Sequence, residues 1–357
     1  MIGQEKFAKR GERMDVLTIL ISIFVFGIII LFHEFGHFIV AKKSGILVEE
    51  FAIGMGPKFI SKKIGETVYS IRVFPLGGFC KMLGQDSALD DNRSFTNKSV
   101  GIRIAVIIAG PLMNLLLAYI IIAWSISSSG FLTTTVNKVL PDSAAQEIGL
   151  QAGDKIISLD GQRIHIKEEI DTIIQQTKDS PIKIVFKRDR TNITKLVTPK
   201  FNGERWLIGF EPKIGENNII NVLVQSFWQL LFIMKQVIIG VIKILTFQVE
   251  KEQVAGPLGV MGIIGQAYQE GMKASLYIAI QYLLSITAII SINLGIMNLL
   301  PIPALDGGRL VFLFLEALRG KPVDVEKEGM IHFIGFALLM TLMVVVLFND
   351  ISRVFTH

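Results

Sequence analysis

Four long runs without a charged side chain constrain this sequence more than any other feature. They cover residues 16–32, 104–130, 274–305 and 329–349 of a chain of 357 residues. About 20 apolar residues in a helix cross the hydrocarbon core of a bilayer. The first run continues through His33 and regains apolar character from Phe38, so it is too long for a signal peptide. We therefore expect a polytopic α-helical membrane protein with about four transmembrane helices.

A fifth apolar stretch, residues 222–247, supports two interpretations. Lys235 and Lys243 interrupt it, and Trp228 and Gln229 lie near its start. These residues favour an amphipathic helix that lies in the membrane interface. A fifth transmembrane helix is the alternative, because long lysine side chains can extend to the headgroups.

The polar segment between the second run and this stretch predicts a small α/β domain in water. Residues 133–140 alternate like a strand, and residues 182–187 and 192–197 alternate like a hairpin around a turn at 189–191. Residues 166–177 have the pattern of a helix. The chain then divides into an N-terminal membrane half at 1–130, an inserted domain at 131–214 and a C-terminal membrane half at 215–357.

The distribution of positive charge predicts the orientation in the membrane. The loop 41–103 carries ten lysine and arginine residues, which makes it cytoplasmic by the positive-inside rule and places the N-terminus outside. The N-terminal tail contradicts this, because it also carries four basic residues: Lys6, Lys9, Arg10 and Arg13. A native start at Met14 would remove all four, and we expect that start.

Charge and cysteine content exclude two other features. The net charge is +5, but no basic stripe alternates with aromatic residues, so we expect no nucleic-acid partner. Cys80 is the single cysteine, so the chain cannot form an intrachain disulfide.

A metal-binding pattern, His33-Glu34-Phe35-Gly36-His37, follows the first apolar run directly. On an α-helix, residues four apart lie about 40° from each other, so both imidazoles can reach one metal ion. Glu34 lies close enough to accept a proton from a water molecule at that ion. Ionisable groups are costly in an apolar span, which favours a functional reason for their presence.

A catalytic zinc ion needs a third protein ligand as well as an open position. Asp306 is the best candidate, because it follows Pro301 and Pro303, which should break the helix of the third run. Gly307 and Gly308 behind it allow unusual backbone conformations. The remaining histidines are less favourable, since each is placed like a surface or interfacial residue: His165, His332 and His357.

Five segments together resemble the site-2 protease family, in particular its bacterial RseP-type members. They are HEFGH at 33–37, FAIGMGPK at 51–58, ETVYSIRVFPLGGFCKMLG at 66–84, RSFTNKSVGIRIAVIIAGPLMNLLLA at 93–118 and NLGIMNLLPIPALDGGRL at 293–310. The resemblance covers nearly the whole chain. It implies that Asp306 is the third zinc ligand. It also implies that four residues shape the site and position the substrate: Asn293, Asn298, Pro301 and Pro303.

The resemblance also implies a re-entrant β-hairpin or sheet at 66–81 beside the active site. Tyr69, Ile71 and Val73 alternate with polar residues, and Pro75 with Gly77-Gly78 can form a turn. An open strand edge there could hold an unwound substrate as an added strand.

The inserted domain resembles a PDZ domain of the permuted bacterial kind. Ser143-Ala144-Ala145 and the segment 149–161, GLQAGDKIISLDG, carry this resemblance. Better-known RseP relatives have two tandem PDZ domains, whereas this insert has room for one.

These resemblances imply an intramembrane zinc metalloprotease with one Zn²⁺ per chain and Glu34 as the general base. The expected substrates are transmembrane segments already trimmed by an upstream site-1-type protease, such as anti-sigma factors or remnant signal peptides. The expected location is the bacterial inner membrane, with the PDZ domain periplasmic and the active site towards the cytoplasm. Two alternatives stay open: a non-catalytic PDZ-bearing scaffold, and a metalloprotease that acts on juxtamembrane or soluble chains.

Overall fold

A computed structural model describes residues 15–85, 89–246, 248 and 256–356. The expected start at Met14 and the basic tail lie outside the described residues, as does His357. The chain forms two compact units, one of residues 122–232 and one of residues 9–121 with 233–357.

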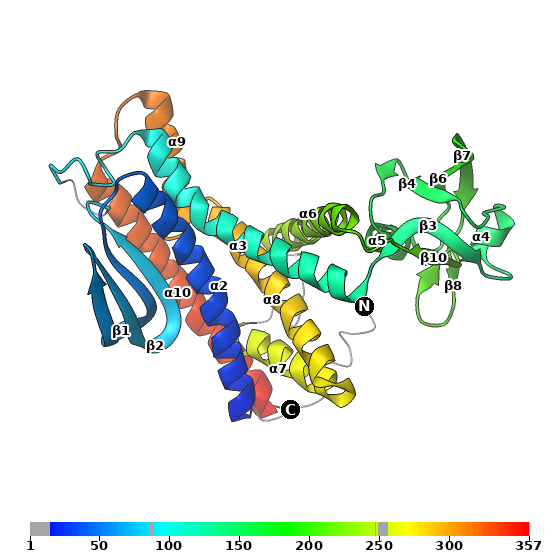
Figure 1. Ribbon diagram of the computed structural model, residues 1–357, viewed down its shortest axis with the longest axis horizontal. Helices are drawn as coiled ribbons and strands as arrows, with labels where there is room; N and C mark the ends of the chain where they lie inside the picture. Colours follow the sequence, from blue (N-terminus) through cyan, green and yellow to red (C-terminus); the bar gives the residue numbers. More distant parts are fainter. Residues whose placement is uncertain (1–14, 86–88, 247, 249–255, 357) are drawn as a thin grey trace. The chain divides into compact units, whose positions relative to one another are not determined.

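The four predicted apolar runs all lie in long helices (Figure 1): α2 (Val16–Lys43), α3 (Val100–Ser129), α8 (Leu276–Leu299) and α10 (Val325–Thr356). Asp15 caps α2, because its carboxylate accepts a hydrogen bond of 2.7 Å from the backbone N–H of Thr18. Large apolar side chains such as Phe24, Phe333 and Leu338 are about 70% exposed. A membrane protein presents such side chains to lipid, so these helices fit the expected α-helical membrane protein.

The fifth stretch forms one continuous helix, α6 (Ile219–Leu245). Five helices in the described part of the chain are long and apolar enough to cross a membrane, and α6 is one of them. Length and composition alone do not separate a crossing from an interfacial helix. The number of crossings therefore stays a prediction.

Two helices of the second unit were not expected from the sequence: α7 (Pro257–Ala274) and α9 (Asp306–Arg319). α7 packs against α2, where an added Cβ at Gly265 would lie 2.4 Å from Cγ2 of Thr18. Asp350 of α10 accepts hydrogen bonds from the backbone N–H groups of Gly256 and Gly259 at the start of α7. A carboxylate at a helix N-terminus is stabilising, so these contacts fix α7 to α10.

The segment after α2 forms two long strands, β1 (Val48–Ile64) and β2 (Thr67–Met82), which appear as a curved pair in Figure 1. Ile53 of β1 pairs with both Ile71 and Gly78 of β2, so β2 passes along both sides of β1. The chain must bend between those two partners, and Gly77 there has a φ of +84°. The expected turn near Pro75 is thus a bend inside one strand. The tight connection of the hairpin lies instead at Gly65-Glu66.

The inserted domain contains eight strands and two helices in the first unit. Its main sheet has the order β10-β3-β4-β6-β7, with β5 beside β4. The bounds are β3 (Leu132–Val139), α4 (Ala144–Glu147), β4 (Lys155–Leu159), β5 (Gln162–Arg163), α5 (Lys167–Thr177), β6 (Ile182–Arg188), β7 (Thr191–Val197), β8 (Lys200–Phe201), β9 (Trp206–Leu207) and β10 (Phe210–Ile214). The predicted first strand, helix and hairpin are all present.

One face of this sheet covers the core of the inserted domain. Ile156, Ile184 and Phe186 are buried on that face together with Ile170 and Ile174 of α5. The alternate strand residues point the other way, as the period of two requires. The sheet therefore has a core face and an outer face.

The two ends of the insert lie next to each other. The backbone N–H of Gly215 donates a hydrogen bond of 2.9 Å to the carbonyl of Phe131, and β10 pairs with β3. The chain therefore enters and leaves the inserted domain at neighbouring positions.

Candidate metal centre

Three candidate ligands from two helices converge on one point. His33 and His37 lie one turn apart on α2, and Asp306 is the first residue of α9. Their atoms form a triangle: Nε2 of His33 to Nε2 of His37 is 3.2 Å, and Oδ2 of Asp306 lies 3.1 and 3.4 Å from those two nitrogens. Ligands about 2.0–2.1 Å from a tetrahedral zinc ion lie about 3.3 Å apart. The triangle therefore has the size of three corners of a zinc site.

The ring of His37 is oriented by α3. Its Nδ1 lies 2.8 Å from the carbonyl oxygen of Val106, which can only accept a hydrogen bond. Nδ1 therefore carries the proton, and in the neutral ring Nε2 is left with a lone pair. A backbone carbonyl behind a histidine is a common way to prepare the other nitrogen for a metal.

The ring of His33 is oriented by Asn114 of α3, a residue that is fully buried. Nδ1 of His33 lies 3.3 Å from Nδ2 of Asn114, while Oδ1 of the same amide accepts no hydrogen bond from the described residues. Rotating this amide by 180° exchanges its oxygen and nitrogen and places Oδ1 beside Nδ1 of His33. Oδ1 then accepts from Nδ1–H of His33, which leaves Nε2 of His33 as an acceptor too.

The three candidate ligand atoms are all hydrogen-bond acceptors, and they face one another. Two imidazole lone pairs and Oδ2 of Asp306 lie within 3.4 Å of one another, and Oδ2 has no hydrogen-bond donor in the described part of the chain. A buried carboxylate without a partner is costly. A cation between the three atoms removes this cost, and two imidazoles with a carboxylate suit zinc and leave a fourth position open.

Close packing of α2 and α3 depends on two glycines. An added Cβ at Gly110 of α3 would lie 2.4 Å from Nε2 of His37, and one at Gly36 of α2 would lie 2.2 Å from the carbonyl oxygen of Ala109. Either methyl group would overlap existing atoms. Both helices therefore need glycine where they cross at the metal centre.

Asp306 is positioned by the loop between α8 and α9. As expected, α8 ends at Leu299, immediately before the segment with Pro301 and Pro303. The backbone N–H of Ala304, whose φ is +78°, donates a hydrogen bond of 2.9 Å to Nδ1 of His332. α10 also packs on this loop, since an added Cβ at Gly335 would lie 2.4 Å from Cβ of Pro303.

The expectation that Gly307 and Gly308 adopt an unusual backbone conformation after Asp306 was wrong. Gly307 and Gly308 lie in the first turn of α9 with ordinary helical backbone. Glycine is needed there for space, because a Cβ at Gly307 would lie 2.0 Å from the carbonyl oxygen of Leu300. The unusual conformation belongs to Ala304 instead.

An ion pair between Arg103 of α3 and Glu316 of α9 joins the N-terminal and C-terminal parts of the second unit. Both side chains are close to nine-tenths buried. Leu310 and Leu313 of α9 also belong to the core that contains Ile107 of α3. These contacts hold α9, and so Asp306, against the helix that orients both histidines.

Glu34 lies in a cavity of about 380 Å³ together with the three candidate ligands. Its carboxylate forms a hydrogen bond with the backbone of Cys80 in β2, and an added Cβ at Gly78 would lie 3.3 Å from Cγ of Glu34. The segment 77–80 of β2 lines one side of the cavity. Glu34 and the segment 77–80 of β2 therefore line the same cavity.

The predicted substrate-positioning residues separate into two groups. Asn298 lines the cavity, whereas Asn293 is exposed on α8 and does not line it. Pro301 and Pro303 form the loop before Asp306 and are not among the lining residues. Of the other histidines, His332 supports that loop, and His165 lies in the inserted domain.

Sequence reasoning missed Gly110 and Asn114. Both lie in the second apolar run, in the sequence AGPLMN at 109–114. A buried asparagine in an apolar span was the available signal, because polar groups there need a partner. Periodicity could not show which histidine that partner would be.

Comparison with known proteins identifies the family. Residues 21–342 match Peptidase family M50. The chain belongs to this family, the site-2 proteases. One relative, from Clostridium acetobutylicum, is 41% identical over 95% of this chain and 98% of its own. The zinc metalloprotease RasP of Geobacillus kaustophilus is 34% identical over 96% and 100%, and the regulator of sigma-W protease RasP of Bacillus subtilis is 31% identical over 96% and 100%.

This M50 peptidase is therefore a multi-pass membrane protein and a zinc metalloendopeptidase of the site-2 protease type. Family membership and the convergent ligand set contradict the non-catalytic scaffold. The alignment with RasP of Geobacillus kaustophilus extends over 429 positions, more than the 357 residues here. That relative thus contains segments which this M50 peptidase lacks.

Two of the solved structures that this chain resembles match about a quarter of its length. The PDZ domains of SdrC-like proteins from Listeria innocua and Listeria monocytogenes cover 24% and 23% of this chain and 99% and 86% of their own. Their identities are 25% and 23%, with TM-scores of 0.22 and 0.20. Scores of this size support no conclusion about the M50 peptidase, so its PDZ assignment stays a proposal.

Proposed function

We propose that this chain cleaves peptide bonds within membrane-embedded segments, with zinc held by His33, His37 and Asp306 and with Glu34 as the general base. One observation carries the proposal: the three ligand atoms converge at tetrahedral spacing in the same cavity as Glu34. The cavity is built on α2, an apolar helix long enough to span a bilayer.

Each residue has a separate role in this proposal. Zinc, when bound, polarises the scissile carbonyl and makes water easier to deprotonate. Glu34 accepts the proton of the attacking water and passes it to the leaving amine. The backbone of Cys80 holds the carboxylate of Glu34, while Asn114 and Val106 hold the two imidazoles. Asn298 lies on the cavity wall, where its amide can bind a substrate carbonyl.

The strand edge explains how a helix could be cut. Helical carbonyls are occupied by their own hydrogen bonds, so a transmembrane substrate must unwind before hydrolysis. The segment 77–80 of β2 lies beside Glu34, and its backbone can pair with an unwound segment as an added strand. The substrate's scissile carbonyl would then lie at the metal centre.

One family relative supports the substrate class that we propose. One relative is named a regulator of sigma-W protease, which favours a membrane-bound regulatory protein such as an anti-sigma factor as substrate. We place the enzyme in the bacterial inner membrane and the insert, as one periplasmic PDZ domain, on the outer side. Trimming by an upstream site-1-type protease would precede the cleavage.

A metalloprotease acting on juxtamembrane or soluble chains is the remaining alternative. Cleavage-site mapping by mass spectrometry on a single-span substrate distinguishes the two. Cuts inside the apolar segment support our proposal, and cuts confined to the flanking polar residues contradict it.

Glu34→Gln tests the catalytic role. Glutamine keeps the shape but cannot accept the proton, so we expect cleavage to fall by at least about 10³-fold with zinc content unchanged. Turnover and zinc should be measured on the same purified samples. Turnover near that of the wild type in a zinc-loaded variant would exclude Glu34 as the base.

A further inference from the structure

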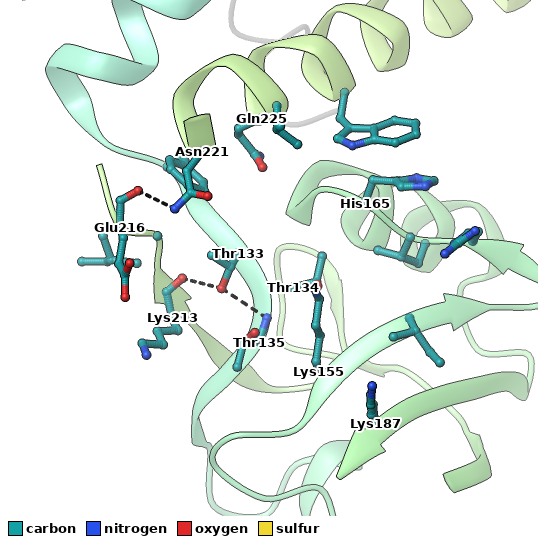
Figure 2. A pocket seen from close by; sticks show the side chains of 18 of the residues that line it. Thr133, Thr134, Thr135, Lys155, His165, Lys187, Lys213, Glu216, Asn221 and Gln225 are labelled. Carbon is teal, nitrogen blue, oxygen red and sulfur yellow. Dashed lines mark hydrogen bonds between the residues drawn. The ribbon is translucent and has the colours of Figure 1, made fainter. Parts of the chain in front are cut away.

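A second cavity, of about 850 Å³, lies within the unit of residues 122–232 and shares no lining residue with the cavity around Glu34. Its floor is the outer face of the sheet, and its opposite wall is the first half of α6 (Figure 2). Thr133 and Thr135 of β3 point towards it, and Asn221 and Gln225 of α6 face them. The cavity therefore lies on the side of the sheet away from the domain core.

The lining of this cavity is strongly basic. Four cationic side chains line it, namely Lys155, Arg163, Lys187 and Lys213, whereas Glu216 is the one acidic lining residue. None of the four cations forms an ion pair with a described residue. Cations gathered around a concave surface raise the local concentration of anions. An anionic ligand would supply the missing counter-charge.

The wall of the cavity is also the start of an exposed apolar surface. Ile219 and Ile220 at the beginning of α6 are each 70% exposed, and Phe227 is 48% exposed. Trp228 also lines the cavity, and its ring stacks on that of His165 at a centroid distance of 3.6 Å. Tryptophan beside basic residues, next to exposed aliphatic side chains, is the composition that proteins present to the headgroup region of a bilayer.

We infer that this cavity binds the phosphate-bearing headgroup of an anionic phospholipid, with the acyl chains along the exposed apolar residues of α6. Charge complementarity selects an anion, and the adjoining apolar surface selects one that carries hydrocarbon. Basic pockets beside membrane helices bind anionic headgroups in this way. A free phosphate ion would use the cations but leave the apolar residues uncovered. An acidic peptide would need no apolar neighbour.

The test uses the full-length protein in a neutral detergent. Phosphatidylglycerol is titrated in short-chain form, and binding is followed by native mass spectrometry. The cavity variant is Lys155→Gln/Lys187→Gln/Lys213→Gln. The matched control removes the same charge from three exposed lysines that do not line the cavity: Lys138→Gln/Lys183→Gln/Lys195→Gln. We expect at least tenfold weaker phosphatidylglycerol binding in the cavity variant and less than a twofold change in the control.

Three further arms decide the ligand class. Phosphatidylcholine should bind at least tenfold more weakly than phosphatidylglycerol. Millimolar glycerol phosphate should not displace the lipid, and an acidic peptide should not compete. Equal binding of both lipids, full displacement by glycerol phosphate or competition by the peptide would each overturn the inference.

A measurement on the wild type guards against misfolding of the cavity variant. Hydrogen exchange at residues 155–158 and 221–228 should slow on addition of phosphatidylglycerol and not on addition of phosphatidylcholine. No lipid-specific protection there would overturn the inference as well. These readouts do not involve cleavage, so they are independent of the proposed catalytic residues.

Discussion

At the scale of single residues, Gly110 decides how closely α3 approaches the two histidines of α2. A Cβ at this position would lie 2.4 Å from Nε2 of His37 and 2.9 Å from Cε1 of His33. Atoms at such distances overlap, and helix backbones on both sides leave little room to relax. Gly110 therefore belongs to the candidate metal centre, although it offers no ligand atom.

Gly110→Ala should lower zinc content and activity together, because the methyl group displaces both imidazoles. We expect at least a tenfold loss of zinc affinity, the size of effect seen when groups behind metal ligands are disturbed. The matched control is Gly101→Ala in the same helix, where an added Cβ meets no atom within 4 Å. Zinc titration on both purified variants is the measurement. Equal affinities in the two variants would show that the predicted overlap is relieved at no cost.

The sequence predicted which ligand residues meet at the candidate metal centre better than it predicted the residues around them. The spacing of His33 and His37 follows from helix geometry alone, so it was readable in advance. The pairing of His33 with Asn114 joins residues 81 positions apart, and no local pattern encodes it. The role of Asn293 stays a prediction: the family resemblance implied it, and the structure shows this residue exposed and outside the cavity lining.

At the scale of elements, the start of β4 is tied to the end of β6 by one ion pair. Oδ1 and Oδ2 of Asp154 accept hydrogen bonds of 2.8 and 2.7 Å from Nε and Nη2 of Arg188. Burial alone would raise the pKa of the Asp154 carboxyl. Arg188 and the backbone N–H of Gln151 outweigh that effect and hold the pKa below its usual range.

Asp154→Asn should therefore destabilise the inserted domain by about 2 kcal/mol at neutral pH. The native carboxyl binds its proton less readily than the unfolded one, so the stabilisation is complete above about pH 4. It is lost as the pH falls through the lower, native pKa. Thermal unfolding of both proteins between pH 3 and 7 measures this. A constant difference between wild type and variant over that range would contradict the ion-pair account.

Elements with a strong period or a clear break were predictable, and mixed ones were not. The prolines at 301 and 303 marked the end of α8, since proline interrupts helical hydrogen bonding. α7 was not predicted because small and polar residues interrupt its apolar pattern. Its position depends instead on tertiary contacts with α2 and α10. The sheet of β1 and β2 was expected, but its bend around Ile53 depends on pairings far apart in sequence.

At the scale of the whole molecule, the insert should act as a filter on substrates and not as part of the catalyst. Its two ends meet at the hydrogen bond between Phe131 and Gly215, so removal need not stretch the chain. None of the residues that line the active-site cavity comes from 131–214. The catalytic groups and the insert are thus separable in the covalent structure.

Replacing residues 133–213 by a linker of roughly four glycine and serine residues should keep cleavage of a short, pre-trimmed substrate. The same variant should also cleave substrates with intact bulky outer domains, which the wild type should reject. Gel-based cleavage of both substrates gives the comparison. Loss of cleavage of the short substrate in a folded, zinc-loaded variant would assign the insert a direct catalytic role.

The central claim is that Asp306 completes the zinc site while Asn298 serves the substrate. Asp306→Ala leaves two imidazoles with two open positions, so bound zinc should fall at least about tenfold. Asn298→Ala should keep close to one zinc per chain and lose activity. Elemental analysis of both variants and the wild type, purified identically and checked by thermal unfolding, is the most direct test. We predict little zinc with Asp306→Ala and full zinc with Asn298→Ala; full zinc in a folded Asp306→Ala variant would contradict the account.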